Sequence, residues 1–86
     1  MTVKKEMIKR VIAGDTVLVP VGKTVYDSNG LFMLNELGSF IWDHLPGAES
    51  EQDILDAVLA EYEVSVAEAG KDIREFLTEL RRLGIL

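Results

Sequence analysis

The sequence changes from a strand pattern to a helix pattern within the stretch Asp27-Ser-Asn-Gly-Leu-Phe-Met-Leu-Asn-Glu-Leu-Gly38. Its first four residues predict a tight turn, because Asn-Gly supplies the positive φ angles that a two-residue hairpin needs. The apolar run at 31–34 then predicts a short strand, and Asn35 has a side chain suited to a helix N-cap. We therefore expect strands before this stretch and helices after it.

The residues before the stretch have the pattern of strands separated by turns. Val11 and Ile12 precede a turn at 13–15, and the β-branched segment 16–19 ends at Pro20. Residues 21–26 have the composition of a further strand extension. Together with 31–34, these segments predict a small antiparallel meander.

Three helices are predicted from Asn35 onward, because apolar residues recur there every three to four positions. The first spans 35–45 and stops at Pro46-Gly47. The second begins at Ser50 and the third at Ser65, and an acidic residue follows each serine three positions later, as in a capping box. The third helix runs to about residue 83, with arginines in its last turn and Gly84 as its C′ residue.

The length and composition limit the class of protein. Eighty-six residues, 48% of them hydrophobic, predict one domain at 1–86 of the α+β class: a winged-helix-like, three-stranded antiparallel sheet followed by three helices. The chain has no cysteine, which excludes disulfides and thiolate metal sites. Its charged first ten residues are unlike a signal peptide, and no apolar run approaches the ~20 residues of a membrane span. We expect a soluble, cytoplasmic protein with no membrane partner.

The charges divide the chain into two regions. Residues 1–30 carry five basic and three acidic side chains, a net charge of +2, whereas 31–86 carry four basic and twelve acidic ones, a net charge of −8. No Lys or Arg lies between Lys23 and Lys71, and the predicted helix 51–62 has four acids and no base. Because nucleic acids are held by Lys and Arg, these charges argue against a nucleic-acid partner. A winged-helix DNA-binding regulator therefore remains only an alternative hypothesis.

Motifs of catalysis, cofactor binding and metal binding are not found in the sequence. His44 is the only histidine, and without positioned partners it is interpreted as a surface or boundary residue. Residues 27–30 lack the flanking acids and the distal Glu of an EF-hand, and the chain contains no glycine-rich phosphate loop. We therefore expect no enzyme activity, no cofactor and no metal.

The apolar run Leu31, Phe32, Met33 and Leu34 is the unusual feature of the sequence. The side chains of a strand alternate between two faces, so four consecutive apolar residues need cover on both. The helices can cover one face. Either a helix, the N-terminal arm or a dimer contact covers the other, or the strand borders an apolar groove that accepts an extended peptide by β-augmentation.

Two longer motifs give the sequence a family resemblance. The segment Leu34-Asn-Glu-Leu-Gly-Ser-Phe-Ile-Trp-Asp-His-Leu45 resembles the L-N-E-x-[GA]-x-x-[IL]-W-x-x-L motif of the PqqD family. The closing segment Asp72-Ile-Arg-Glu-Phe-Leu-Thr-Glu-Leu-Arg-Arg-Leu-Gly-Ile-Leu86 is similar to that family's D-[VI]-x-x-F-[LI]-x-x-L-x-x-x-G-[LI]-[LI] ending. With weaker matches at 12–20 and 61–64, the resemblance covers about residues 8–86.

The resemblance implies a peptide-binding function. Members of the family are recognition elements for precursor peptides that ribosomes make and enzymes modify; the namesake acts in pyrroloquinoline quinone biosynthesis. They catalyse nothing themselves and deliver the leader of the precursor to a modifying enzyme, often a radical S-adenosylmethionine (SAM) enzyme. The leader would add as a strand beside 31–34, in a cleft walled by the helix at 66–83.

The helix at 66–83 offers two flanks for that cleft. A helical wheel places Phe76 and Leu77 near the centre of the buried face, with Asp72 and Glu79 on one flank and Arg74 on the other. The sequence does not decide between the flanks, and Trp42 is interpreted as a core residue. The peptide-binding residues that we expect are Leu31, Phe32, Met33, Leu34, Asp72, Phe76 and Glu79.

Two further points stay open at this stage. A structural subunit of an enzyme complex, with the apolar strand buried by a partner protein, is a second alternative function. The chain is expected to be a monomer or a dimer, since an exposed strand edge allows a swapped dimer.

Overall fold

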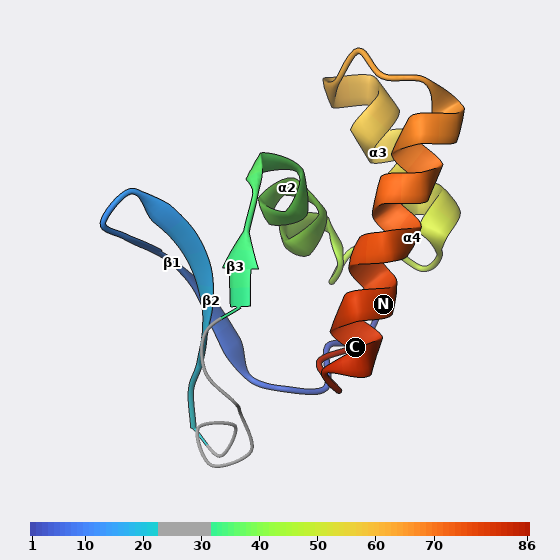
Figure 1. Ribbon diagram of the computed structural model, residues 1–86. Coiled ribbons are helices and arrows are strands. Elements are labelled where there is room, and N and C mark those ends of the chain that lie inside the picture. The colour runs from blue at the N-terminus through green and yellow to red at the C-terminus, as the bar shows by residue number, and fades with distance from the viewer. Residues whose placement is uncertain (23–31) are drawn as a thin grey trace.

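A computed structural model of the protein describes residues 1–22 and 32–86 (Figure 1). The predicted turn at 27–30, the extension beyond Gly22 and the first residue of the apolar run, Leu31, lie outside the described residues. The order of the elements is three strands followed by three helices. This order confirms the predicted α+β architecture.

The sheet is antiparallel, with the strands in the order β1-β2-β3. β1 spans Met7–Ile12, β2 spans Asp15–Pro20 and β3 spans Phe32–Leu34. Ala13 and Gly14 join β1 to β2 with φ angles of 51° and 85°. Positive φ at both central residues is the geometry of the hairpin turns that match the twist of the strands.

The three helices begin near the positions that the sequence predicts. α2 spans Glu36–His44, α3 spans Glu51–Glu61 and α4 spans Val66–Arg82. The Asn35 side chain accepts a hydrogen bond from the Gly38 N–H at 2.7 Å, and the Ser65 hydroxyl accepts one from the Glu68 N–H at 3.1 Å. Both side chains therefore act as the predicted N-caps.

The capping prediction for α3 is wrong in one respect. Ser50 occupies the N-cap position, but its side chain makes no capping hydrogen bond. The Asp53 carboxylate instead accepts a hydrogen bond from the Glu49 N–H at 2.8 Å. This charge-assisted hydrogen bond ties the chain that enters the helix to its first turn.

The end of α4 closes with a glycine, as predicted. Gly84 has a φ of 73°, and its N–H donates to the Arg81 carbonyl at 3.0 Å. The Ile85 N–H donates to the Leu80 carbonyl at 2.9 Å, and the Ile85 side chain is buried. This pair of hydrogen bonds is a Schellman motif, which directs the last residues back against the helix.

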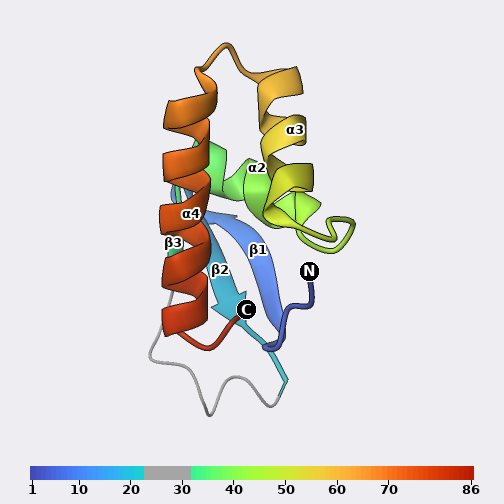
Figure 2. The same cartoon turned by 90° about the vertical axis from the view of Figure 1, so that its right-hand side faces the viewer.

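The hydrophobic core lies mainly among the helices. Figure 2 shows α3 and α4 side by side, and Figure 1 shows α2 between the sheet and this pair. The fully buried side chains of the helical layer come from all three helices: Ile41, Leu45, Ile54, Val58, Ile73, Leu77 and Leu80. Trp42 is half-buried against this core, which agrees with its interpretation as a core residue.

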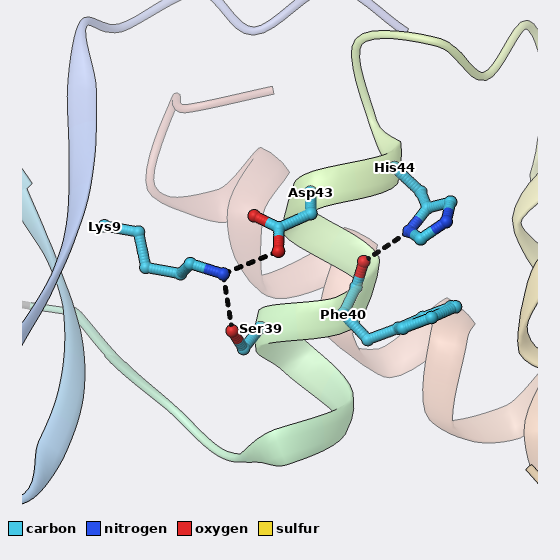
Figure 3. A network of polar contacts seen from close by, with 5 residues as sticks. All are labelled: Lys9, Ser39, Phe40, Asp43 and His44. Carbon is cyan, nitrogen blue, oxygen red and sulfur yellow. Dashed lines mark hydrogen bonds and ion pairs between the residues drawn. The ribbon is translucent and has the colours of Figure 1, made fainter. Parts of the chain in front are cut away.

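A polar contact joins the sheet to α2 on the helix-facing side of β1. The Lys9 Nζ donates to the Ser39 hydroxyl at 2.8 Å and lies 2.6 Å from a carboxylate oxygen of Asp43 (Figure 3). Leu18 of β2, which pairs with Lys9, is fully buried on the same face. One face of the sheet therefore packs on the helices.

The N-terminal arm, residues 1–6, runs along the ends of the helices. The Lys4 N–H donates to the Ile85 carbonyl at 2.7 Å, and the Lys5 ammonium donates to the Leu83 carbonyl at 2.9 Å. The Met1 amine donates to the Leu45 carbonyl at 2.9 Å. The arm thus ties α2 to the end of α4 and does not cover β3.

Candidate functional site

The outer edge of β3 is the first component of the site. β3 pairs with β2 on one side only, and no other strand of residues 1–22 and 32–86 pairs with its second side. Backbone N–H and C=O groups along such an edge are available to a further strand. The edge can therefore accept an extended peptide.

The side chains of β3 alternate between the two faces of the sheet. Leu34 is buried and Phe32 is half-buried on the face that packs on the helices. Met33 is 64% exposed and pairs with Val17, on the face directed away from the helices. The N-terminal arm is one of the covers considered for that face. This prediction is wrong, because the arm packs against the ends of the helices.

An aromatic contact connects β3 to α4. The rings of Phe32 and Phe76 lie edge to face, with their centroids 6.1 Å apart and an angle of 62° between their planes. Figures 1 and 2 show α4 running along the helix side of the sheet. The contact fixes how α4 stands over β3, so strand and helix border one site.

A pocket of about 350 Å³ opens directly beyond the end of β3. It lies between the first turns of α2 and the middle of α4. Its wall combines apolar surface with two carboxylates, contributed by Asn35, Leu37, Gly38, Ile41, Asp72, Glu75 and Phe76. This volume is at the lower end of the roughly 300–1,000 Å³ range of ligand pockets, and suits one or two side chains.

Gly38 keeps the pocket open and lets α4 approach α2. A Cβ at this position would lie 3.2 Å from the Phe76 ring and 3.1 Å from the Asn35 side-chain oxygen. Both distances are shorter than ordinary van der Waals contact, so a larger side chain would displace the ring or the cap. The glycine, the cap and the aromatic ring therefore form one packed unit.

The structure distinguishes the two flanks of α4. Asp72 and Phe76 line the pocket beside β3 and α2. Gly70 and Arg74 line a separate cavity of about 140 Å³ against α3, and Arg81 lies 3.8 Å from a carboxylate oxygen of Glu51 in α3. The Asp72 side of α4 therefore faces the pocket beside α2, and the Arg74 side faces α3.

The carboxylates on the Asp72 side of α4 differ in their partners. Glu79 is paired with Arg82, whose Nε donates to a Glu79 oxygen at 3.0 Å. This hydrogen bond holds the pKa of the Glu79 carboxyl below its ordinary value. Asp72 and Glu75 make no side-chain hydrogen bond or ion pair with the described residues. The pocket thus keeps two carboxylates without a cation of their own.

His44 is not among the residues that line this pocket. His44 is exposed, stacks on Phe40 and places its Nδ1 2.8 Å from the Phe40 carbonyl oxygen (Figure 3). Among residues 1–22 and 32–86, no group of three or more His, Asp or Glu side chains could hold a metal ion. Within the same residues, no helix has the length and apolar character of a membrane span.

The sequence-predicted site residues are therefore only partly brought together. Asp72 and Phe76 line the pocket, Phe32 touches Phe76, and Glu79 lies further along α4 in its pair with Arg82. Met33 and Leu34 point to opposite faces of the sheet.

Sequence reasoning missed five pocket residues, namely Asn35, Leu37, Gly38, Ile41 and Glu75. A signal existed in the small residue, Gly or Ala, that the family motif requires at position 38.

Comparisons with known proteins identify the family and the fold. The model of the family described as Coenzyme PQQ synthesis protein D (PqqD) matches residues 15–86. A search of curated proteins found no match. Among solved structures, the chain is similar to TbiB1 in complex with the TbiA(beta) leader peptide, with 29% identity, 100% of this chain and 94% of that chain covered, and a TM-score of 0.75. It also has the fold of the lasso peptide synthetase B1 complexed with the leader peptide. The identity is 24%, 98% of this chain and 93% of that chain are covered, and the TM-score is 0.73.

Proposed function

Because the chain belongs to the PqqD family, we propose that it binds the leader segment of a ribosomally made precursor peptide. The leader adds as a strand to the outer edge of β3 and presents the rest of the precursor to a modifying enzyme. The observation that carries this proposal is the unpaired edge of β3 beside a pocket on α4. The likeness to TbiB1, whose structure holds a leader peptide, supports it.

Binding by strand addition divides affinity and specificity between two kinds of contact. Main-chain hydrogen bonds to β3 supply sequence-independent affinity, and side-chain pockets on either face select the peptide. A micromolar complex corresponds to about −8 kcal/mol, which a short strand with two or three buried anchors supplies. Phe32 and Phe76 provide apolar surface for such an anchor on the helix side.

The other expected site residues have distinct roles in this proposal. Asp72 borders the pocket, and Glu79 extends the negative charge along α4. Met33, which is 64% exposed, flanks the incoming strand on the face of the sheet directed away from the helices, while Leu34 is a buried residue on the opposite face. Leu31 precedes β3 and belongs to the same proposed binding segment.

The module catalyses no reaction in this proposal and acts as one domain of residues 1–86. Its partners are the precursor peptide and a modifying enzyme, for which a radical SAM enzyme is the leading candidate by family resemblance. The edge of β3 lacks a strand partner within the described chain, so a monomer already offers the binding surface.

The proposal is tested by titrating the ¹⁵N-labelled full chain with a synthetic leader. The gene neighbourhood is first searched for a short precursor-like reading frame; the N-terminal part of its product is the probe, and a scrambled peptide of the same composition is the control. We expect saturable shifts of the backbone amides of β3 and α4, and slower hydrogen exchange along β3. Shifts confined to β1, or equal shifts with the scrambled peptide, would overturn strand addition at β3.

A further inference from the structure

The wall of the pocket between α2 and α4 combines two kinds of surface. Leu37, Ile41 and Phe76 give it an apolar interior, and Asp72 and Glu75 give it negative charge. We propose that this pocket selects a lysine or arginine side chain of the bound peptide, an inference that rests on the proposed function. The aliphatic stem of that side chain lies along the apolar wall, and its cationic head meets the two carboxylates.

The charges in and around the pocket favour a cation from outside. Three acids of the described chain, Asp43, Glu51 and Glu79, have a basic partner within 4.0 Å, whereas Asp72 and Glu75, like most of the other acids, have none; what sets these two apart is that both line the pocket. Two basic residues are near them in the sequence. Arg74 lines the cavity against α3, and Lys71 is exposed and makes no ion pair with the described residues. The two carboxylates are therefore available to a ligand.

The N-terminus of α2 does not reverse this preference. A helix N-terminus favours anions through its free N–H groups. Here the Asn35 side chain already accepts the hydrogen bond of the Gly38 N–H, and Glu36 places a further negative charge in the first turn. No Lys or Arg occurs between Lys23 and Lys71 to offset these acids. Lys9 of β1 contacts α2 but pairs there with Asp43, so the charged side chains that line the pocket are the carboxylates of Asp72 and Glu75.

The shape of the pocket suits a long side chain with a charged end. Lys and Arg bury their aliphatic stems on apolar surface and keep the charged head at the rim. A cation close to an aromatic ring gains a further attraction, and Phe76 supplies such a ring in the wall. A purely apolar peptide side chain would leave the two carboxylates at the mouth without a partner and with less water around them.

The inference is tested with a displayed library of random peptides, selected on the full-length protein and on the double variant Asp72→Asn/Glu75→Gln. The matched control is Glu49→Gln/Asp56→Asn, which removes the same charge from two exposed residues outside the pocket. Circular dichroism checks that all three proteins are folded. The best peptide is then resynthesised with norleucine in place of its enriched basic residue, and its affinity is measured at low and high salt.

The expected result is one enriched Lys or Arg position with wild type and with the control, and loss of that enrichment with the pocket variant. Norleucine should weaken binding to wild type by about three- to tenfold, because each partly exposed charge pair contributes modestly. The difference should shrink at high salt. Peptides enriched without a basic position, or with an acidic one, would refute the inference and leave the proposed function standing. Enrichment of no peptide at all would refute both.

Discussion

The contact between Phe32 and Phe76 holds β3 at a fixed distance from α4, and its removal leads to a quantitative prediction. Both rings are half-buried, and they meet edge to face at 6.1 Å. Truncating a fully buried Phe to Ala costs about 3–5 kcal/mol, so a half-buried ring should cost about 2 kcal/mol. We expect Phe32→Ala and Phe76→Ala each to lower the free energy of unfolding by about 2 kcal/mol.

The double variant separates the pair from the burial of its members. An edge-to-face aromatic pair contributes about 0.5–1.5 kcal/mol beyond area burial. Once one ring has been removed, the second truncation no longer breaks this contact. The double variant should therefore be less destabilised than the sum of the single variants, by about 1 kcal/mol.

Urea unfolding without any peptide measures all four free energies. Trp42 is the only tryptophan and is half-buried against the core, so its fluorescence reports unfolding of the helical layer. Thermal unfolding by circular dichroism should agree, with midpoints lowered by about 8–16 °C for each single variant. A coupling energy of zero would show that the two rings contribute independently, and that the contact does not position β3 against α4.

Two further predictions concern Met33 and Glu79. Met33→Asp should leave the fold intact, because the side chain is 64% exposed, and should weaken leader binding severalfold; a folded variant that binds the leader as tightly as wild type contradicts the strand assignment. The pKa of Glu79 is lower in the folded protein than its ordinary value of 4.5. Its pair with Arg82 therefore stabilises the folded protein at pH values above 4.5, and this stabilisation is lost as the pH falls through the pKa of Glu79 in the folded state. The loss of stability in Glu79→Gln should therefore be greatest near pH 7 and vanish in acid. A difference between the unfolding curves of the two proteins that does not change with pH would contradict this prediction.

Local signals in the sequence predicted most of the fold. Asn35, Ser65 and Gly84 mark helix ends, and each lies at the predicted place, because capping depends on residues only a few positions apart. Ser50 shows the limit of such signals. Asp53 follows Ser50 three positions later, as Glu68 follows Ser65, yet here the carboxylate accepts from the Glu49 N–H and the serine makes no capping hydrogen bond.

The pocket was harder to predict, since it depends on how two distant elements pack. The helical wheel placed Asp72 and Arg74 on opposite flanks of α4 but could not say which flank faces β3. That choice depends on α3, which packs against the Gly70 side and leaves the Asp72 side to α2. Periodicity gives the angle between two residues on one helix, whereas the orientation of the helix in the fold is a tertiary property.

The same few residues at the start of α2 carry both the fold and the pocket. Asn35 caps the helix, the Gly38 N–H donates the capping hydrogen bond, and the Phe76 ring lies against Gly38. A change at any of these positions would disturb the helix start as well as the pocket. Asp72 and Glu75 are different, because their side chains make no hydrogen bond or ion pair with the described residues. If the pocket reads a peptide side chain, its specificity can therefore change at these two positions of α4 while the fold is preserved.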